Sequence, residues 1–92
     1  MVKVKKGQQF TASKLTADEK KKLLLKTGSL IKAARLERTT LAEFAYEINI
    51  SRTQIIKHEA GGDMLFSTFL KLLYGLDIKP EEFFRELQKE GK

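Results

Sequence analysis

The segment from Thr40 to Ser51 constrains the fold of this chain more than any other part of the sequence. Apolar or small residues recur there at the i, i+3, i+4 and i+7 spacing of one helical face, and these are Leu41, Phe44, Ala45 and Ile48. Thr40 precedes them and can cap the exposed N–H groups of the first turn. Asn49 follows them, and Asn is one of the few residues that tolerate left-handed backbone angles. The pattern therefore predicts a short helix that ends in a sharp turn.

A second short helix is expected directly after this turn. Ile50 offers an apolar anchor inside the turn, and Ser51 offers a second N-cap. In the helix from Ser51 to Glu59, helical spacing places Ile55 and His58 inward. The outward positions carry no acidic residue and are Arg52, Thr53, Ile56 and Lys57.

Two short helices joined by a tight turn are the geometry of a DNA-reading helix-turn-helix. The small residue Ala45 allows the two helices to cross closely. A helix fits the major groove, where Arg, Lys and Thr can pair with base edges and Ile can contact a thymine methyl. The alternative is an ordinary helical hairpin with a solvated face. The fixed order of a small residue, a left-handed-tolerant residue, an apolar anchor and a cap favours the DNA-reading interpretation.

These residues resemble the lambda-repressor-like family of helix-turn-helix regulators, also called the Cro or xenobiotic-response-element (Xre) type. The resemblance extends over roughly residues 28–87. It rests on LAEFAYEINIS across the turn, on Arg35, on Glu59 with Gly61, and on the later STFLKLLYGLDIKPEEFF. It implies an all-α domain of five helices, here preceded by a basic N-terminal extension.

The resemblance, together with the helical pattern, assigns a role to each candidate residue. The residues expected to read bases are Arg52, Thr53, Ile56 and Lys57. Those expected to contact phosphates or position the reading helix are Thr40, Ser51 and Gln54. Those expected to be structural are Arg35, Ala45, Asn49, Ile55, Glu59 and Gly61. The resemblance implies that Glu59 pairs with Arg35, with Arg38 as the alternative partner.

Three features depart from the pattern of this family. Leu41 stands where the family usually has a Gln that hydrogen-bonds phosphate. The segment between Arg35 and Leu41 is about one residue shorter than is usual in the family. His58 takes an inward position that is usually apolar or aromatic. A lone inward His is more often a hydrogen-bonded core side chain than a ligand or a pH switch, which favours the first interpretation.

The net charge of +6 is concentrated at the N-terminus. Residues 1–26 hold eight lysines and two acidic residues, whereas residues 27–92 hold ten basic and ten acidic residues. We therefore divide the chain into a basic arm with the start of the first helix, residues 1–26, and a helix-turn-helix domain, residues 27–92. Arm lysines expected to contact phosphates are Lys3, Lys5, Lys6 and Lys14. A solvated tail that only raises solubility is the alternative.

A long helix is expected before the two-helix segment. Thr16 and Glu19 have the spacing of a capping box, which predicts that a helix begins there and runs to about residue 38. Gly28 either is tolerated inside this helix or marks a break in it. The residues available for burial along it are Leu24, Leu25, Ile31, Ala34 and Leu36.

Two more helices are expected after the two-helix segment. Ser67 is predicted to cap the first of them after a loop over residues 63–66. Its apolar residues at helical spacing are expected in the core rather than at a cofactor, and they are Phe66, Phe69, Leu70, Leu73 and Leu76. Pro80 suits the first turn of the last helix, and one of Phe83 and Phe84 is expected to face outward.

Several function classes are disfavoured by what the sequence lacks. It contains no cysteine, which excludes a disulfide framework and a Cys-based zinc site. One His and no glycine-rich phosphate loop give no catalytic or metal-binding constellation, so we expect no enzyme activity, no cofactor, no metal and no small-molecule ligand. No apolar run is long enough for a membrane span or a signal peptide, so no membrane partner and a cytoplasmic location are expected.

The sequence therefore predicts a sequence-specific transcriptional regulator, in the simplest case a repressor. Its expected partners are double-stranded DNA and a second copy of the chain, bound as a homodimer to a palindromic operator. One alternative is an antitoxin-like or phage-type module that mainly binds a protein partner, a toxin or a phage factor. The other is an architectural protein that binds DNA without sequence preference through the basic arm.

Overall fold

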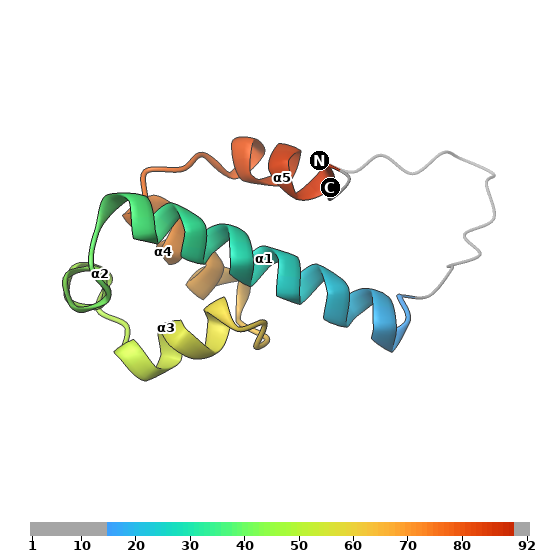
Figure 1. The fold of residues 1–92 in the computed structure, drawn as a ribbon, viewed down its shortest axis with the longest axis horizontal. Coiled ribbons are helices and arrows are strands. Elements are labelled where there is room, and N and C mark those ends of the chain that lie inside the picture. Colours follow the sequence, from blue (N-terminus) through green and yellow to red (C-terminus); the bar gives the residue numbers. More distant parts are fainter. Residues whose placement is uncertain (1–14, 90–92) are drawn as a thin grey trace.

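The structure, a computed structural model, describes residues 15–89, and every regular element in that range is a helix. In chain order these are α1 Ala17–Arg38, α2 Leu41–Ile48, α3 Arg52–Glu59, α4 Phe66–Gly75 and α5 Pro80–Gln88. The long helix α1 lies between α5 on one side and α3 on the other, and its N-terminal end extends past both (Figure 1). The expected arm contacts, Lys3, Lys5, Lys6 and Lys14, lie outside the described residues.

The beginning of α1 confirms the predicted capping box. Thr16 Oγ1 accepts a hydrogen bond from the backbone N–H of Glu19 at 3.1 Å, and Glu19 Oε1 accepts one from the N–H of Thr16 at 3.1 Å. The helix then passes through Gly28 without a break. Gly28 is therefore tolerated inside the helix and does not break it. The helix is also continuous across residues 26 and 27, where the charge pattern of the sequence changes.

Fewer apolar side chains of α1 are buried than the sequence predicts. Ile31 is fully buried, whereas Leu25 and Leu36 are 47% and 66% exposed, so the predicted burial of those two is wrong. Leu36 follows the buried Arg35 by one residue, which turns it about 100° away from the covered side of the helix. Leu25 lies on the N-terminal half of α1, beside Gly61 in the turn after α3.

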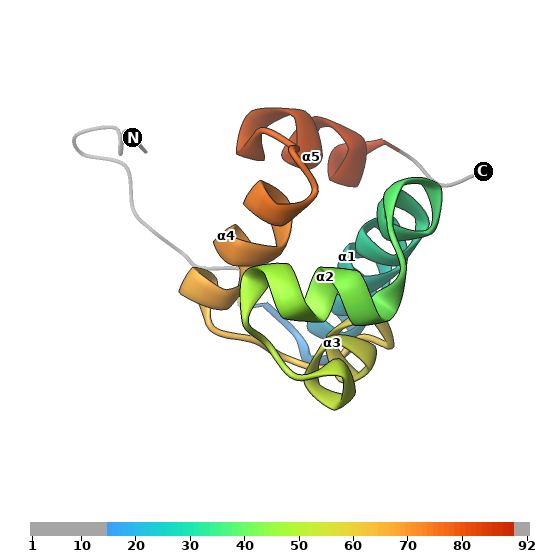
Figure 2. The same cartoon turned by 90° about the vertical axis from the view of Figure 1, so that its left-hand side faces the viewer.

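The core is built from the apolar sides of all five helices. Its buried members are Ile31, Phe44, Ile48, Ile50, Ile55, Phe69, Leu72, Leu73, Leu76 and Phe83. Leu72 is fully buried although it was not predicted in the core, and the predicted core position of Phe66 is wrong, because that side chain is 65% exposed. Phe66 is the first residue of α4, and that end of the helix lies at the edge of the molecule (Figure 2).

The ends of α4 and α5 differ in how well the sequence predicted them. The predicted cap at Ser67 is wrong, because α4 begins at Phe66 and its N-cap is Leu65, with no side-chain hydrogen bond. Pro80 does occupy the first turn of α5, as predicted. Phe83 is 3% and Phe84 41% exposed, which confirms that one phenylalanine of the pair faces outward.

Candidate nucleic-acid interface

The connection between α2 and α3 has the local geometry that the sequence predicts. Thr40 Oγ1 accepts from the N–H of Glu43 at the start of α2, and Ser51 Oγ accepts from the N–H of Gln54 at the start of α3, both at 3.1 Å. Asn49 ends α2 with φ 59° and ψ 48°, the left-handed conformation. Ile50 is buried beneath the turn, and its N–H donates to the carbonyl of Ala45 at 3.2 Å. The direction of α3 is thereby set by α2 (Figure 2).

We define the outer face of α3 as Arg52, Thr53, Ile56 and Lys57. All four side chains are exposed, with Ile56 52% exposed, and the flanking Ser51 and Gln54 are exposed as well. On the opposite side, Ile55 and His58 are buried at 0% and 5% exposure. The predicted division of α3 into an inward and an outward side is thus confirmed. Each predicted base-reading residue lies at the surface of a single helix.

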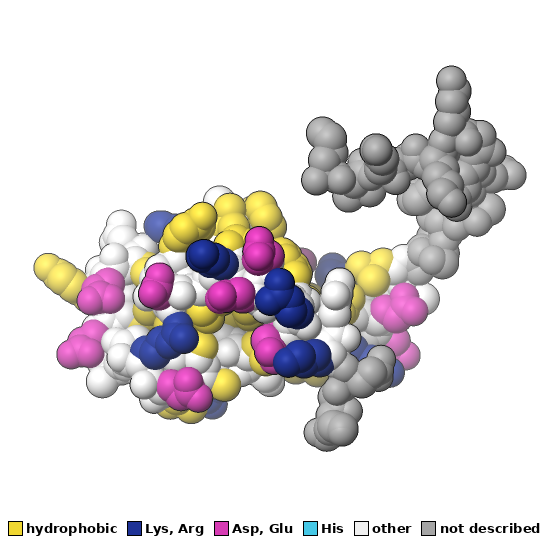
Figure 3. Space-filling model, turned by 90° about the horizontal axis from the view of Figure 1, so that it is seen from above, with side chains coloured by type: hydrophobic (Ala, Val, Ile, Leu, Met, Phe, Trp, Pro, Cys, Tyr) yellow, Lys and Arg dark blue, Asp and Glu magenta, His cyan; other side chains and the backbone are white. Residues whose placement is uncertain are grey.

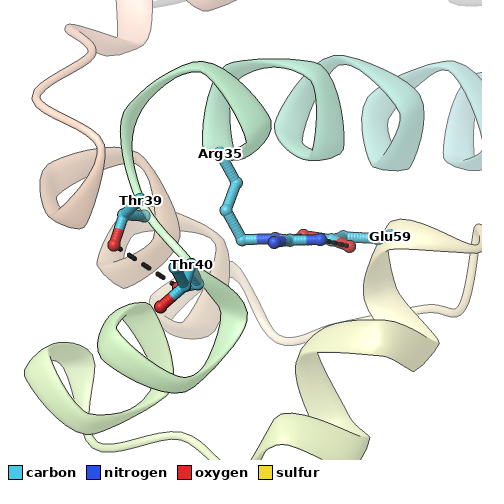
Figure 4. A network of polar contacts seen from close by, with 4 residues as sticks. All are labelled: Arg35, Thr39, Thr40 and Glu59. Atoms are coloured by element: carbon cyan, nitrogen blue, oxygen red, sulfur yellow. Dashed lines mark hydrogen bonds and ion pairs between the residues drawn. The ribbon is translucent and has the colours of Figure 1, made fainter.

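A buried ion pair fixes the end of α3 to α1. Arg35 Nε donates to Glu59 Oε2 at 2.5 Å and Arg35 Nη2 donates to Glu59 Oε1 at 3.0 Å, a two-point contact that holds both planar groups in one orientation (Figure 4). The two side chains are 9% and 4% exposed. The alternative partner Arg38 instead donates to the carbonyl of Leu76, at the C-terminal end of α4.

The Arg35 side of this ion pair stays charged throughout the neutral range. The hydrogen bonds to Glu59 raise the pKa of Arg35 above its ordinary value, against the opposing effect of burial, and the charge of Glu59 adds to the increase. A basic group with a raised folded-state pKa stabilises the fold fully below its ordinary pKa, and this stabilisation is lost only as pH rises through the folded value. For Arg35 that window lies in strong alkali, so physiological pH changes do not release α3 through this residue.

The backbone of α3 also touches the backbone of α1 at Gly28. A Cβ atom placed on Gly28 would lie 2.5 Å from the carbonyl oxygens of both His58 and Glu59, closer than real Cβ atoms come to oxygen. Just after the end of α3, Gly61 adopts φ 102°. The N–H of Gly61 donates to the carbonyl of His58 at 3.0 Å, and the N–H of Gly62 donates to the carbonyl of Lys57 at 2.9 Å. This is the Schellman arrangement that closes a helix end. Gly28 and Gly61 thus fix where α3 ends against α1.

His58 departs from the expected hydrogen-bonded core histidine. It is buried as predicted, but neither Nδ1 nor Nε2 has a hydrogen-bond partner among the described residues. The expected hydrogen bond to a neighbouring protein group is therefore absent among the described residues. Because it is buried on the inward side of α3, it offers no ligand to the outer surface of this helix.

The sequence analysis did not select one basic residue beside this surface. Lys32 is exposed on α1 and lines a shallow depression between α1 and α3 with Leu41, Ile56 and Ala60. It precedes Arg35 by three residues, so both lie on the same side of α1. The three-residue spacing between Lys32 and Arg35 could have indicated from the sequence that Lys32 lies beside α3. Within residues 15–89 no acidic side chain forms an ion pair with Lys32, Arg52 or Lys57.

The described part of the chain offers this surface few other chemical roles. No group of three or more His, Asp or Glu side chains between residues 15 and 89 is arranged to hold a metal ion. None of the described helices combines the length and apolar character needed to cross a membrane. Comparison of the chain with protein-family models, with curated proteins and with solved structures found no match.

Proposed function

We propose that this protein is a sequence-specific DNA-binding transcriptional regulator with a helix-turn-helix of the lambda-repressor-like type. The observation that carries the proposal is the outer face of α3, where all four candidate base-reading side chains are exposed on a helix whose other side is fixed to α1. A rigid helix that presents Arg, Lys and Thr to solvent meets the requirements of the major groove, which is wide enough to admit one α-helix.

Each exposed side chain has a role in this proposal. Arg52 and Lys57 donate to guanine O6 and N7, and Thr53 and Ile56 contact base edges or thymine methyl groups. The hydroxyl groups of Thr40 and Ser51 accept from backbone N–H groups, so their protons remain to be donated to phosphate oxygens. Lys32, at the flank of α3, adds a phosphate contact. Binding as a homodimer then occludes a promoter that contains a palindromic operator, without an enzyme activity, in the cytoplasm.

The test is selection of the protein on random duplex DNA at near-physiological salt, followed by sequencing of the bound fraction. Enrichment of a two-fold symmetric motif with half-sites about one helical turn apart, roughly 34 Å, is the expected result. Binding without enrichment would instead indicate an architectural protein that contacts only the backbone. No binding at all would contradict the proposal.

Arg52→Ala tests the assignment of the reading helix. We expect a loss of about 1–3 kcal/mol in binding to the selected site, together with relaxed preference at one base position. Lys71→Ala is the matched control, since Lys71 is also basic and exposed but lies on α4. The control should bind like the wild type. An equal loss on every DNA sequence would show that Arg52 contacts only phosphate.

A second candidate function is a protein-interaction module with secondary DNA binding. Leu41 favours it, because this first residue of α2 is half-buried against the core and offers no polar group to a phosphate. The exposed Phe66 and Phe84 also favour a protein partner. Failure to select DNA, combined with co-purification of a single stoichiometric protein, would support this candidate over the first.

A further inference from the structure

A groove runs between α1 and α5, on the side of α1 that faces away from α3 (Figure 1). Its apolar lining comes from both walls and consists of Leu30, Ala33, Ala34, Ile78 and Phe83. The volume of the groove is about 550 Å³, which is in the range of pockets that hold bound groups. Seen from the side that carries α5, apolar side chains lie between acidic and basic ones (Figure 3). A ligand of this groove does not cover the outer face of α3.

Three cations beside the groove are engaged within the chain. Lys26 donates to the carbonyl of Lys89, and Arg38 donates to the carbonyl of Leu76. Arg85 Nη2 lies 3.9 Å from an oxygen of Glu81, which does not line the groove. Within residues 15–89, none of these three cations forms an ion pair with an acidic side chain of the groove.

Two carboxylates of the groove make no ion pair with any residue between 15 and 89. Glu37 lines the α1 wall and Glu82 lines the α5 wall, whereas Glu86 pairs with Lys89 at 2.8 Å. Glu37 also lies in the last turn of α1, where the negative end of the helix dipole adds to its preference for a cation. The groove therefore fits a segment that is both apolar and basic.

An exposed apolar side chain connects the beginning of α1 to this groove. Leu23, Leu30 and Glu37 follow one another at intervals of seven residues, which places them on the same side of α1. Leu23 is 45% exposed. A segment that runs back from the beginning of α1 along this side covers Leu23 before it enters the groove.

The segment that precedes α1 has the matching chemistry. Residues 1–14, which lie outside the described residues, contain four lysines and no acidic residue. Val2 and Val4 alternate with Lys3 and Lys5, so in an extended backbone the valines share one side and the lysines share the other. The valines match the apolar floor of the groove. The long lysine side chains can reach the carboxylates at its walls.

The length of this segment also suffices. Leu30 lies about 22 Å along the helix from Leu15, a distance that about seven extended residues span. The groove runs from Leu30 to Arg38, about 12 Å, which is the length of about four extended residues. Residues 8–14 thus cover the way back along α1, and residues 2–5 fill the groove.

We infer that the N-terminal segment, residues 1–14, occupies the groove between α1 and α5, with Val2 and Val4 on its apolar floor and Lys3 and Lys5 at Glu37 and Glu82. This inference goes beyond the proposed function and does not rest on it, because both partners belong to one chain. Lys3 and Lys5 cannot bind these carboxylates and a phosphate backbone at the same time. A docked segment therefore withholds two of the lysines that are expected to contact phosphates.

Disulfide trapping in the full chain without DNA tests the inference. The chain contains no cysteine, so two introduced cysteines define a single possible disulfide within it. Val4→Cys combined with Ala33→Cys joins the segment to the groove, and Ala33 is exposed. Val4→Cys combined with Lys32→Cys is the matched control, since Lys32 is the neighbouring exposed residue but faces the α3 side of α1. We expect the groove pair to form its disulfide at least about tenfold faster, because docking raises the effective concentration of the two thiols.

Two further changes test the contacts in the chain that carries the groove pair. Val2→Ser should slow the disulfide about tenfold, because it removes an apolar side chain from the floor. Gln8→Ser, which changes the segment outside the groove, should leave the rate unchanged. Glu37→Gln with Glu82→Gln should slow it about threefold, the size expected for two exposed ion pairs.

Each outcome either supports or overturns the inference. Equal rates for the groove pair and the control pair, or a groove pair that is indifferent to Val2→Ser, overturn it. A rate that rises with protein concentration also overturns it, because the segment then reaches the groove of another molecule. Since no DNA is present, failure of this experiment leaves the DNA-reading proposal intact, and failure to select DNA leaves the trapping result intact.

Discussion

The attachment of α3 to α1 and the attachment of α4 to α5 are chemically opposite. On the α3 side the buried contacts include an Arg35–Glu59 ion pair, two backbone carbonyls against Gly28, and an imidazole that no described residue hydrogen-bonds. On the α4 side, the contact is aromatic, with the rings of Phe69 and Phe83 edge to face at 5.2 Å. Both helices bury apolar residues in the core, but α3 is also held to α1 by directional polar groups, whereas α4 and α5 meet through non-directional apolar burial.

This difference means that the contacts that orient α3 are not the contacts that contribute most to the stability of the fold. Apolar burial stabilises a fold roughly in proportion to area and tolerates small rotations of a helix. A two-point ion pair and a backbone contact tolerate almost none, although a buried ion pair adds little net stability over apolar residues of similar size. The α3 attachment therefore fixes an orientation, whereas the α4–α5 attachment supplies stability and leaves surplus apolar surface exposed. Substitutions on the two sides should show this contrast.

Breaking the ion pair on one side should produce the largest effect. We predict that Arg35→Met lowers the free energy of unfolding by about 3–5 kcal/mol, because Glu59 is left buried without a partner. The double change Arg35→Met with Glu59→Leu should restore stability to within about 1 kcal/mol of the wild type, because no buried charge remains. Urea unfolding of the two single variants and the double variant measures this cycle. A double variant as unstable as Arg35→Met would show that the ion pair stabilises the fold rather than orienting α3.

The next largest effect compares two glycines, Gly28 at the contact of α1 with α3 and Gly75 at the contact of α4 with α2. Gly28→Ala should cost about 3 kcal/mol, because its Cβ meets backbone carbonyls that cannot rotate away. Gly75→Ala should cost less, because the neighbours of its Cβ are side-chain atoms of Ile48 and Phe44. Thermal unfolding of both variants at equal concentration checks the order. If Gly75→Ala were the more damaging change, the packing of α2 on α4 would be the more rigid of the two.

The sequence predicted the α2–α3 region better than the rest, and the reason is local. The conformations of Thr40, Asn49 and Ser51 depend on neighbours within three or four residues, so the chain itself encodes them. The partner of Glu59 is 24 residues away, and only the family resemblance selected Arg35 in advance. Exposure of Phe66 could not be predicted from helical spacing, because it depends on α4 beginning at the edge of the molecule.

The candidate site shows the same limit. Helical periodicity was enough to divide α3 into inward and outward residues, because one turn of spacing decides that question. Lys32 was missed, since its place beside Ile56 follows from how α1 crosses α3. The close approach of the α3 carbonyls to Gly28 is likewise a property of that crossing, and the sequence left Gly28 open between a tolerated residue and a helix break.

The smallest predicted effect concerns His58 and has the opposite sign. Its two ring nitrogens are buried and no residue between 15 and 89 hydrogen-bonds them, and an unsatisfied buried polar group costs about 1–3 kcal/mol. His58→Leu removes both polar atoms at similar volume, so we predict that it raises the free energy of unfolding by about 1 kcal/mol, after allowance for imperfect packing of the new side chain. In a domain of this size that corresponds to an increase of roughly 4–8 °C in Tm.

His58→Met serves as a second apolar variant, because its flexible side chain can fill the same space if a branched leucine cannot. If both variants are more stable than the wild type, the buried imidazole destabilises the fold because its nitrogens lack partners. The aromatic contacts of α4 and α5 carry no such cost. Both variants destabilised by 1 kcal/mol or more would mean that the imidazole makes hydrogen bonds through a buried water, since only a satisfied polar group is expensive to replace with an apolar one. That result would make His58 a third orienting contact of α3, beside the ion pair and Gly28.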